Sequence, residues 1–471
     1  MSSIFGALIE PVDLIPPREL GPVHFIAIGG AGMSGIAALY AELGIEVSGS
    51  DQADSQVLTD LAGRGIRVHT GHAAEQLGRA GTVVVSSAIR ADNPELVEAR
   101  ARGLRIWHRS AALGALMLGR PGVAVTGTHG KTTTSGMLAH LLTECGSDPG
   151  YVIGAALASS GTSFRLGTGP FVVEADESDG SFRQYPADIA VITNVEADHL
   201  DNWGTPEAYL DGFRTFAAEA RRVVANLDDP GVRAVLGDRE TKDAGWITFG
   251  SGPPARVLLT DAEQVGFSAR ARLLDLPLEL SVPGRFNLAN GAAAVLAAHA
   301  LGVDVAVALT ALRGFRGTAR RFTPVGTVDG VDVVDDYAHH PTEVQATLAA
   351  ARAGAHDRGG RVIACFQPHL FTRTRDFADE FGVALAGADE VVLMDIFAAR
   401  EDPIPGVTSD LLVASCAAHG RPARLVSDRD AVPEVVADLA RPGDIVLTLG
   451  AGDVTRIGPE IVEALRARSG R

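Results

Sequence analysis

One pattern occurs three times along this chain: a short run rich in β-branched residues, a glycine turn, and a stretch with alanine and leucine at helical spacing. The three copies are VHFIAIGGAGMSGIAALYAELG from Val23, VAVTGTHGKTTTSGMLAHLLTECG from Val123 and DIVLTLGAGDVTRIGPEIVEALRAR from Asp444. Each copy predicts a strand followed by a helix. Because strands and helices that alternate along a chain build parallel sheets with helices on both faces, we predict an α/β fold.

The length of the chain predicts how many such units it holds. At roughly 150 residues per domain, 471 residues correspond to about three domains. The turn LGRPG and the Gly/Arg-rich segment from Gly314 to Gly326 are the places where one unit gives way to the next. We therefore predict domains over residues 1–119, 120–322 and 323–471.

Charge and composition exclude several classes of protein. The 41 Lys+Arg against 58 Asp+Glu give a formal net charge of −17, so the chain lacks the broad basic face that nucleic-acid binding requires. Three distant cysteines argue against a disulfide framework. The acidic N-terminal segment and the interrupted apolar stretch over 291–312 predict neither a signal peptide nor a membrane span. We expect a cytoplasmic protein with no nucleic-acid or membrane partner.

The first glycine turn has the spacing of a dinucleotide-binding loop. Gly30, Gly32 and Gly35 follow a predicted strand, and the acidic Asp51 ends a second predicted strand about 20 residues later. Glycines let the backbone approach a diphosphate, and the helix N-terminus faces its charge. The N-terminal domain is therefore predicted to be Rossmann-like, with the nucleotide that carries the diphosphate left open between a nicotinamide, a flavin and others.

The second glycine turn predicts an ATP site in the central domain. It reads Thr126-Gly127-Thr128-His129-Gly130-Lys131-Thr132, a shortened form of the P-loop in which Val125 stands where the usual motif has glycine. Backbone N–H groups of such a loop hold β- and γ-phosphates, the lysine neutralises them, and the threonine hydroxyl binds Mg²⁺.

Two acidic segments downstream are candidates to complete the ion site. Glu174 lies inside the apolar run FVVEADESD and is the first choice, whereas Asp179 is interpreted as a cap of the next helix. His199 follows another buried-looking strand in ITNVEADHLD, and we assign it metal or phosphate binding.

A third group of polar residues follows the second domain boundary. Asp336, Tyr337 and His339 stand in DDYAHHP, where Pro341 also fits the first turn of a helix. Arg373 and Arg375 follow a later strand, and arginines at such a place suit an anionic substrate.

Taken together, the motifs resemble one family. The ordered set GTHGKTTT, VEADESDGSF, ITNVEADHLD, VPGRFNLANGAAA, TARRF, DDYAHHPTE, FQPHLFTRTRD and GAGDV is similar to that of the Mur ligases, from about Val23 to near the C-terminus. The resemblance implies a cytoplasmic enzyme of peptidoglycan synthesis with a UDP-binding domain, an ATPase domain and a Rossmann-like C-terminal domain. Within the family the motifs are closest to those of the branch that ligates L-alanine to the lactyl carboxylate of UDP-N-acetylmuramate.

The resemblance also implies roles for individual residues. Lys131 contacts the β/γ-phosphates of ATP, and Thr132, Glu174 and His199 surround Mg²⁺, with Mn²⁺ as the alternative ion. The remaining implied contacts are Asn290, Arg321 and Asp336 near ATP, Ser50, Asp51, Ser86 and Ser87 near the uridine or sugar, and Tyr337, His339 and Arg373 at the alanine site. The reaction passes through an acyl phosphate, and His339 is the candidate acceptor of the ammonium proton.

Three alternatives remain open at this stage. A Mur-type ligase that joins a recycled murein tripeptide to UDP-N-acetylmuramate would share the UDP and ATP motifs. A nicotinamide-dependent dehydrogenase is supported only by the Gly30 turn and Asp51. A UDP-sugar-binding protein without activity would not need a complete ATP and Mg²⁺ set, namely Lys131, Thr132, Glu174 and His199. We expect a monomer or a homodimer.

Overall fold

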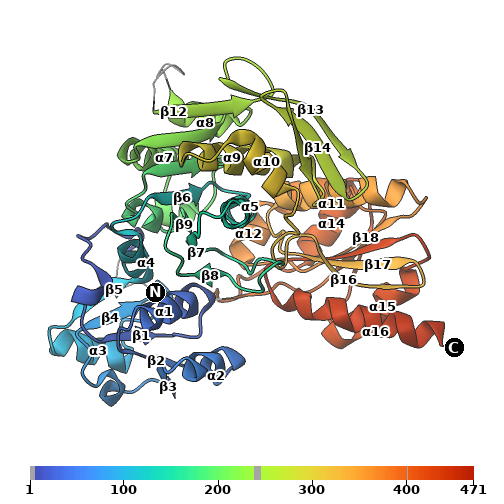
Figure 1. Ribbon diagram of the computed structural model, residues 1–471. Coiled ribbons are helices and arrows are strands. Elements are labelled where there is room, and N and C mark those ends of the chain that lie inside the picture. The colour runs from blue at the N-terminus through green and yellow to red at the C-terminus, as the bar shows by residue number, and fades with distance from the viewer. Residues whose placement is uncertain (1–5, 238–244, 400, 471) are drawn as a thin grey trace. The chain divides into compact units, whose positions relative to one another are not determined.

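The computed structural model describes residues 6–237, 245–399 and 401–470, and its strands form three sheets (Figure 1). By the density of contacts within it, the chain divides into two compact units. The first unit comprises residues 1–259, 273–276 and 289–312, and the second comprises 260–272, 277–288 and 313–471. The predicted domain boundaries fall between the sheets and stay a prediction.

The N-terminal sheet has the order β3-β2-β1-β4-β5, with all strands parallel. Its strands are β1 (Val23–Ile26), β2 (Val47–Asp51), β3 (Arg67–Thr70), β4 (Thr82–Val85) and β5 (Arg105–His108). The connecting helices are η1 (Pro17–Glu19), α1 (Ala31–Glu42), α2 (Gln56–Gly63), η2 (Ala74–Leu77), α3 (Pro94–Ala101) and α4 (Arg109–Met117). The chain order reverses on either side of β1, and in such sheets ligands bind outside the carboxyl ends of the strands at that point. The Rossmann-like prediction for this sheet is confirmed.

The central sheet has the order β15-β14-β13-β12-β11-β10-β6-β9-β7-β8. Its strands are β6 (Gly122–Thr126), β7 (Gly150–Val152), β8 (Phe164–Arg165), β9 (Phe171–Glu174), β10 (Ile189–Ile192), β11 (Arg222–Asn226), β12 (Trp246–Gly250), β13 (Val257–Val265), β14 (Ser268–Leu273) and β15 (Leu276–Leu280). Its helices are α5 (Lys131–Glu144), η3 (Ser181–Gln184), α6 (Leu200–Trp203), α7 (Pro206–Glu219), α8 (Pro230–Leu236), α9 (Arg285–Ala300) and α10 (Val305–Leu312). Strand β6 lies between β10 and β9, all three parallel, so their carboxyl ends meet at one edge.

The C-terminal sheet has the order β16-β17-β21-β18-β19-β20. Its strands are β16 (Thr323–Val328), β17 (Val331–Asp336), β18 (Val362–Phe366), β19 (Glu390–Leu393), β20 (Ala423–Leu425) and β21 (Ile445–Leu449). Its helices are α11 (Pro341–His356), α12 (Phe371–Asp376), α13 (Ala378–Leu385), α14 (Asp410–Ala418), η4 (Arg429–Ala431), α15 (Val432–Leu439), η5 (Asp453–Arg456) and α16 (Ile457–Ser469). Helices α11, α13 and α14 cover one face and α15 and α16 the other (Figure 1).

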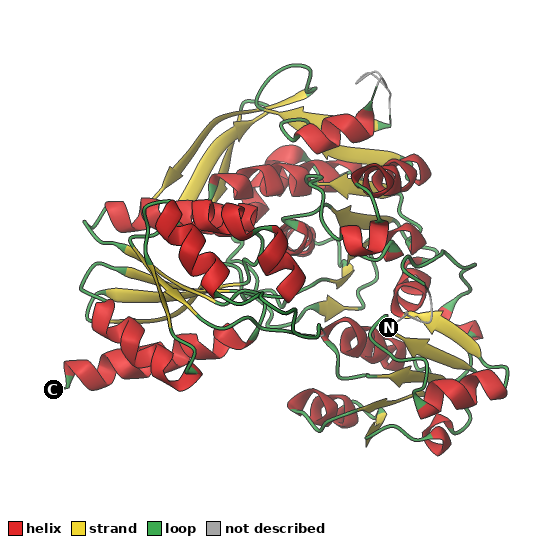
Figure 2. Cartoon of the chain, turned by 180° about the vertical axis from the view of Figure 1, so that it is seen from behind, coloured by secondary structure: helices red, strands yellow, loops and turns green. Residues whose placement is uncertain are grey.

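The sheets are not uniformly parallel. Strand β16 runs antiparallel to β17, and β7 runs antiparallel to β8. In each pair the connection between the two strands is too short for a crossover helix. The second strand therefore lies antiparallel to the first. Figure 2 shows that helices and strands otherwise alternate along most of the chain, as the repeated pattern predicted.

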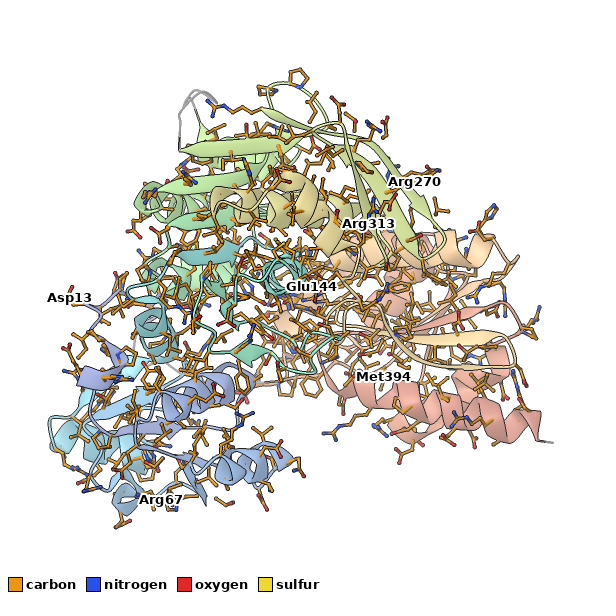
Figure 3. All side chains as sticks on the ribbon, viewed as in Figure 1. Asp13, Arg67, Glu144, Arg270, Arg313 and Met394 are labelled. Atoms are coloured by element: carbon orange, nitrogen blue, oxygen red, sulfur yellow. The ribbon has the colours of Figure 1, made fainter. Side chains whose placement is uncertain are left out.

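Apolar side chains fill the layers between helices and strands. Strands β1, β6, β10, β18 and β21 are buried along their whole length, as expected of central parallel strands. Figure 3 shows the contrast: Met394 lies within the C-terminal core, whereas Arg67 extends to the surface and pairs with Glu46.

A segment before β1 packs on the central sheet's loops. The backbone N–H of Val12 donates to Gln184 Oε1 at 2.7 Å, and Gln184 Nε2 donates to Val12 O at 2.9 Å. The N–H of Ile9 donates to Asp179 O at 2.8 Å. We call residues 8–14 the N-terminal arm; it is joined in sequence to one sheet and hydrogen-bonded to a loop of the next.

Candidate active site

The loop between β6 and α5 is shaped by glycine. Gly127 and Gly130 have φ of +132° and +82°, a region that other residues rarely adopt. Gly130 is also the N-cap of α5, and no side chain caps this helix end. A Cβ at Gly130 would lie 2.7 Å from Oδ1 of Asn290, which places the predicted Asn290 directly against the loop. The result is an open helix N-terminus that suits a phosphate.

Lys131 points back over this loop. Its Nζ donates to Gly127 O at 2.6 Å, to Thr128 O at 3.1 Å and to Glu177 Oε1 at 3.0 Å. Burial disfavours the charged ammonium, but Glu177 and Asp176 outweigh it and hold the pKa of Lys131 above its usual value. The lysine is therefore a fixed positive charge at the phosphate-binding loop.

Two of the predicted ion ligands lie side by side. Thr132 Oγ1 donates to Glu174 Oε1 at 2.9 Å, and the other oxygen of Glu174 accepts from the N–H of Gly154 at 2.6 Å. The pairing of β9 with β6 explains this, since Glu174 is in register with Val125 at the end of both strands. A hydroxyl and a carboxylate oxygen thus meet where the sequence predicted them.

The segment after β10 is hydrogen-bonded to the same loop. Asn194 accepts from the N–H of His129 at 2.8 Å and donates to His129 O at 2.9 Å. Thr128 Oγ1 donates to Glu196 O at 2.8 Å and accepts from the N–H of Glu196 at 2.9 Å.

His199 caps α6 just beyond this segment. It has a φ of +53°, and its Nε2 lies 3.5 Å from Asp198 Oδ2. Within α6, Trp203 Nε1 donates to Glu177 O at 2.9 Å. His199 is therefore flanked by contacts to the P-loop on one side and to the 176–179 loop on the other, and its role as an ion ligand stays a prediction.

The acidic 176–179 loop joins several elements. Arg109 donates to Asp176 Oδ2 at 3.3 Å, and Ser87 donates to Asp179 Oδ2 at 2.9 Å. Burial disfavours the ionised form of Asp176, but Arg109 and Lys131 outweigh it, so the pKa of Asp176 lies well below its usual range. Asp179 Oδ1 accepts from the N–H of Ser181, the first residue of η3, at 3.1 Å, although the N-cap position of that helix is Gly180.

Glu177 is the fully buried member of this loop. Burial raises its pKa to about 7, although the Lys131 ammonium opposes the shift. When Glu177 is ionised, it forms an ion pair with Lys131 at 2.9 Å in a site with little access to water.

The first glycine turn opens α1. Gly30 is the N-cap of α1, again without a capping side chain, and Asp51 Oδ2 accepts from the N–H of Gly29 at 2.9 Å. A Cβ at Gly32 would lie 2.9 Å from Nη1 of Arg109, so a guanidinium lies against the start of this helix. Gly35 instead gives room to the ring of Phe164, which makes close packing with β8 its evident role.

The predicted serines of the N-terminal domain differ in their surroundings. Ser50 is fully buried and donates to Glu95 Oε2 at 2.5 Å, with His72 Nδ1 2.9 Å away. Ser86 and Ser87 follow β4 and are half-buried. Ser50 thus belongs to an internal polar network, while Ser86 and Ser87 lie at the carboxyl edge of the sheet.

In the second unit, Asp336 ends β17 and anchors the turn around it. It accepts from the N–H of Phe322 and of Ala338, each at 2.8 Å, and burial raises its pKa to about 6 although Arg321 opposes the shift. The Tyr337 ring lies under two guanidinium groups, with Arg320 Cζ 4.8 Å and Arg321 Cζ 5.2 Å from its centroid.

His339 is held by its neighbours in the same unit. Its Nδ1 lies 3.0 Å from Tyr337 O, and its ring contacts those of Tyr337 and His369 edge-on. Burial lowers its pKa to about 3, helped by Arg373 and opposed by Glu343. Arg373 is buried in α12, whereas Arg375 is half-exposed and pairs with Asp376 at 2.6 Å. The structure brings Tyr337, His339 and Arg373 into one neighbourhood and turns Arg375 toward Asp376.

Three family profiles match the chain in order. They are described as Mur ligase family, catalytic domain (residues 22–121), Mur ligase middle domain (125–298) and Mur ligase, glutamate ligase domain (320–452). The chain belongs to the Mur ligase family.

Relatives of this Mur ligase match it over nearly its whole length. A protein of Cutibacterium acnes named UDP-N-acetylmuramate--L-alanine ligase is 57% identical and covers 98% of this chain and 100% of its own length. One of Thermobifida fusca with the same name is 51% identical over the same shares. The crystal structure of UDP-N-acetylmuramate-alanine ligase MurC from Thermotoga maritima has a TM-score of 0.79 at 29% identity, over 96% of this chain and 100% of that one.

The site of this Mur ligase includes residues to which sequence reasoning assigned no ligand role. Arg109 lies in α4, 77 residues (109 − 32) after the glycine against which it packs, and Glu177 reaches Lys131 from another loop. Neither contact follows from local spacing; the one signal in the sequence was the position of Glu177 just after a buried strand. In the described part of the chain, helices are too short or too polar to cross a membrane.

Proposed function

We propose that this Mur ligase joins L-alanine to the lactyl carboxylate of UDP-N-acetylmuramate, with ATP converted to ADP and phosphate and UDP-N-acetylmuramoyl-L-alanine as product. The observation that carries the proposal is the full-length similarity to relatives named UDP-N-acetylmuramate--L-alanine ligase. The Lys131 ammonium at the glycine loop and the hydrogen-bonded pair of Thr132 and Glu174 support an ATP-dependent reaction. The site of action is the cytoplasm.

The ATP end of the reaction uses the P-loop. Residues 126–132 surround the phosphates, Lys131 neutralises the β/γ charge, and Asn290 closes the loop from α9. Thr132 and Glu174 offer the hard oxygen ligands that Mg²⁺ or Mn²⁺ prefers, so the residues present fit a divalent ion, with His199 as a third ligand. When bound, the ion supplies charge neutralisation at the transferred phosphoryl group.

The UDP end uses the first glycine turn. Gly30 and Gly32 present the N–H groups of α1 to the diphosphate, and Arg109 adds a positive charge beside them. Asp51, Ser86 and Ser87 face the uridine and sugar from the carboxyl edge of the sheet. Ser50 acts on this site through its hydrogen bonds to Glu95 and His72.

The chemistry requires activation because a carboxylate oxygen is a poor leaving group. Transfer of the γ-phosphoryl group to the lactyl carboxylate gives an acyl phosphate, and the alanine amine then displaces phosphate through a tetrahedral intermediate. Positioning and charge neutralisation govern such transfers, so no nucleophilic side chain is needed. Arg321 and Asp336 complete the nucleotide contacts.

The alanine end uses the group around His339. Arg373 holds the alanine carboxylate, Tyr337 lines the site, and Arg375 contributes to the anionic surroundings. We assign His339 as the acceptor of the ammonium proton: with Nδ1 hydrogen-bonded to Tyr337 O, Nε2 is the ring atom left to accept it.

The test is ADP release from the purified protein with ATP, Mg²⁺ and UDP-N-acetylmuramate. L-alanine, glycine, L-serine and the tripeptide L-Ala-γ-D-Glu-diaminopimelate are compared as acceptors. Turnover that requires L-alanine supports the proposal. Turnover only with the tripeptide would instead assign the chain to peptide recycling, and no turnover with any acceptor would contradict a ligase.

A further inference from the structure

We propose that Glu177 competes with the phosphates of ATP for Lys131, so that nucleotide binding exchanges one anionic partner of this lysine for another. The proposal rests on the ATP-binding role proposed above for Lys131. It adds a residue whose carboxylate sets how tightly the nucleotide is held, without itself contacting the reacting atoms.

The hydrogen-bond capacity of the Lys131 ammonium is limited. An ammonium group has three N–H donors and no acceptor. Lys131 Nζ donates to Gly127 O, Thr128 O and Glu177 Oε1, and the second carboxylate oxygen, Glu177 Oε2, lies 2.9 Å from it, so all three donors are in use. A phosphate oxygen can therefore bond to Lys131 only if one of these acceptors gives up its place.

Glu177 is the acceptor that a phosphate replaces. The two carbonyls precede Lys131 by four and three residues and belong to the phosphate-binding loop itself. Glu177 is 46 residues away, and its ionised carboxylate is an anion that a phosphate can replace with another anion. The N-terminus of α5, which begins at Lys131, favours the anion as well.

The Glu177 carboxylate cannot follow the lysine far. It is fully buried, and its backbone carbonyl accepts from Trp203 Nε1 at 2.9 Å and from the N–H of Gly180 at 3.2 Å. The neighbouring Asp176 is held by Arg109. Since the loop is fixed on both sides of Glu177, the flexible end of Lys131 is the part that moves, and the carboxylate remains as a competitor.

Replacing Glu177 by a neutral residue of the same shape should therefore strengthen nucleotide binding instead of weakening it. Glu177→Gln keeps the shape and a hydrogen-bond acceptor but removes the competing charge. We expect the Kd values of ADP and of a non-hydrolysable ATP analogue, measured with Mg²⁺ by calorimetry, to fall by roughly tenfold, the order of effect of one close charge pair at a binding site. A residue that merely supported the loop would give the opposite change, because its loss would weaken binding.

The control removes a carboxylate from α5, the helix that begins at Lys131, at its opposite end. Glu144→Gln lies at the C-terminal end of α5 and is exposed (Figure 3), so nucleotide Kd should stay within about twofold. In a Lys131→Met background, Glu177→Gln should lose its effect, since the competition acts through the ammonium.

Weaker or unchanged nucleotide binding by Glu177→Gln overturns the proposal. Where that variant does not fold, Glu177→Asp serves instead: the shorter side chain lengthens the ion pair, and a smaller tightening is expected, whereas weakening again overturns the idea. The binding measurements contain neither UDP-N-acetylmuramate nor L-alanine. A failure of alanine-dependent ADP release by the wild type would therefore contradict the proposed ligase function and leave the competition at Lys131 standing.

Discussion

Substitution of Gly130 by alanine tests whether the left-handed turn before α5 shapes the phosphate site. A non-glycine residue at the Gly130 φ of +82° costs about 1–2 kcal/mol. The new Cβ would also lie 2.7 Å from Oδ1 and 3.3 Å from Cγ of Asn290, so that side chain must move. If the free loop relaxes and nucleotide binding restores it, this cost is lost from the binding free energy. We expect Mg²⁺-ADP to bind about 5- to 30-fold more weakly.

A matched control lies at the other end of the same helix. Gly146 follows α5, has a φ of +74°, and within the described residues no atom is near its hypothetical Cβ. Gly146→Ala bears the same backbone cost without the contact to Asn290. Thermal melts of the free proteins should show the larger loss of stability for Gly146→Ala, because the free loop of Gly130→Ala relaxes, while titration calorimetry with Mg²⁺-ADP should show weaker binding for Gly130→Ala alone. Equal nucleotide affinity in the two variants would refute the reasoning.

Further predictions concern three charged or titratable residues. Lys131→Ala should abolish turnover but leave binding of UDP-N-acetylmuramate within about twofold, as measured by calorimetry. Arg373→Ala should raise the KM for L-alanine at least tenfold and leave that for ATP nearly unchanged; an equal rise in both would indicate a structural role. Burial lowers the pKa of His339 from 6.5 to about 3, so the unfolded chain binds a proton first as pH falls below 6.5. Wild type should therefore lose about 2 kcal/mol of unfolding free energy between pH 7 and pH 5 that His339→Gln does not lose, as measured by urea titration; parallel pH curves would contradict the assignment.

Local patterns in the sequence predicted much of the fold. The runs beginning at Val23, Val123 and Asp444 became β1, β6 and β21, each followed by a helix, because a buried strand and an amphipathic helix differ in the period of their apolar residues. Pro341 begins α11, as its fixed φ suggested. The antiparallel pairing of β7 with β8 and of β16 with β17 was not predicted, because the repeated strand–helix pattern indicates parallel neighbours only.

Those site residues were predicted whose role follows from their place in a local sequence motif. Thr132 was expected in the phosphate-binding loop and Glu174 at the end of a strand, and parallel pairing of β6 with β9 brings their side chains to 2.9 Å. The burial of Ser50 beneath Glu95 depends on a helix that begins more than 40 residues later. The contact of Arg109 with Gly32 was likewise not predicted. It depends on how two helices pack, and neither segment alone indicates it.

The N-terminal arm has a practical consequence for anyone preparing this protein. The family profile begins at residue 22, and a chain trimmed to that match would keep every described strand. It would nevertheless lose both hydrogen bonds between the Gln184 amide and the Val12 backbone. The Asp179 carbonyl would also lose its hydrogen bond from the Ile9 N–H. Unsatisfied buried polar groups cost about 1–3 kcal/mol each. An affinity tag is therefore better fused after residue 471 than in place of the first dozen residues.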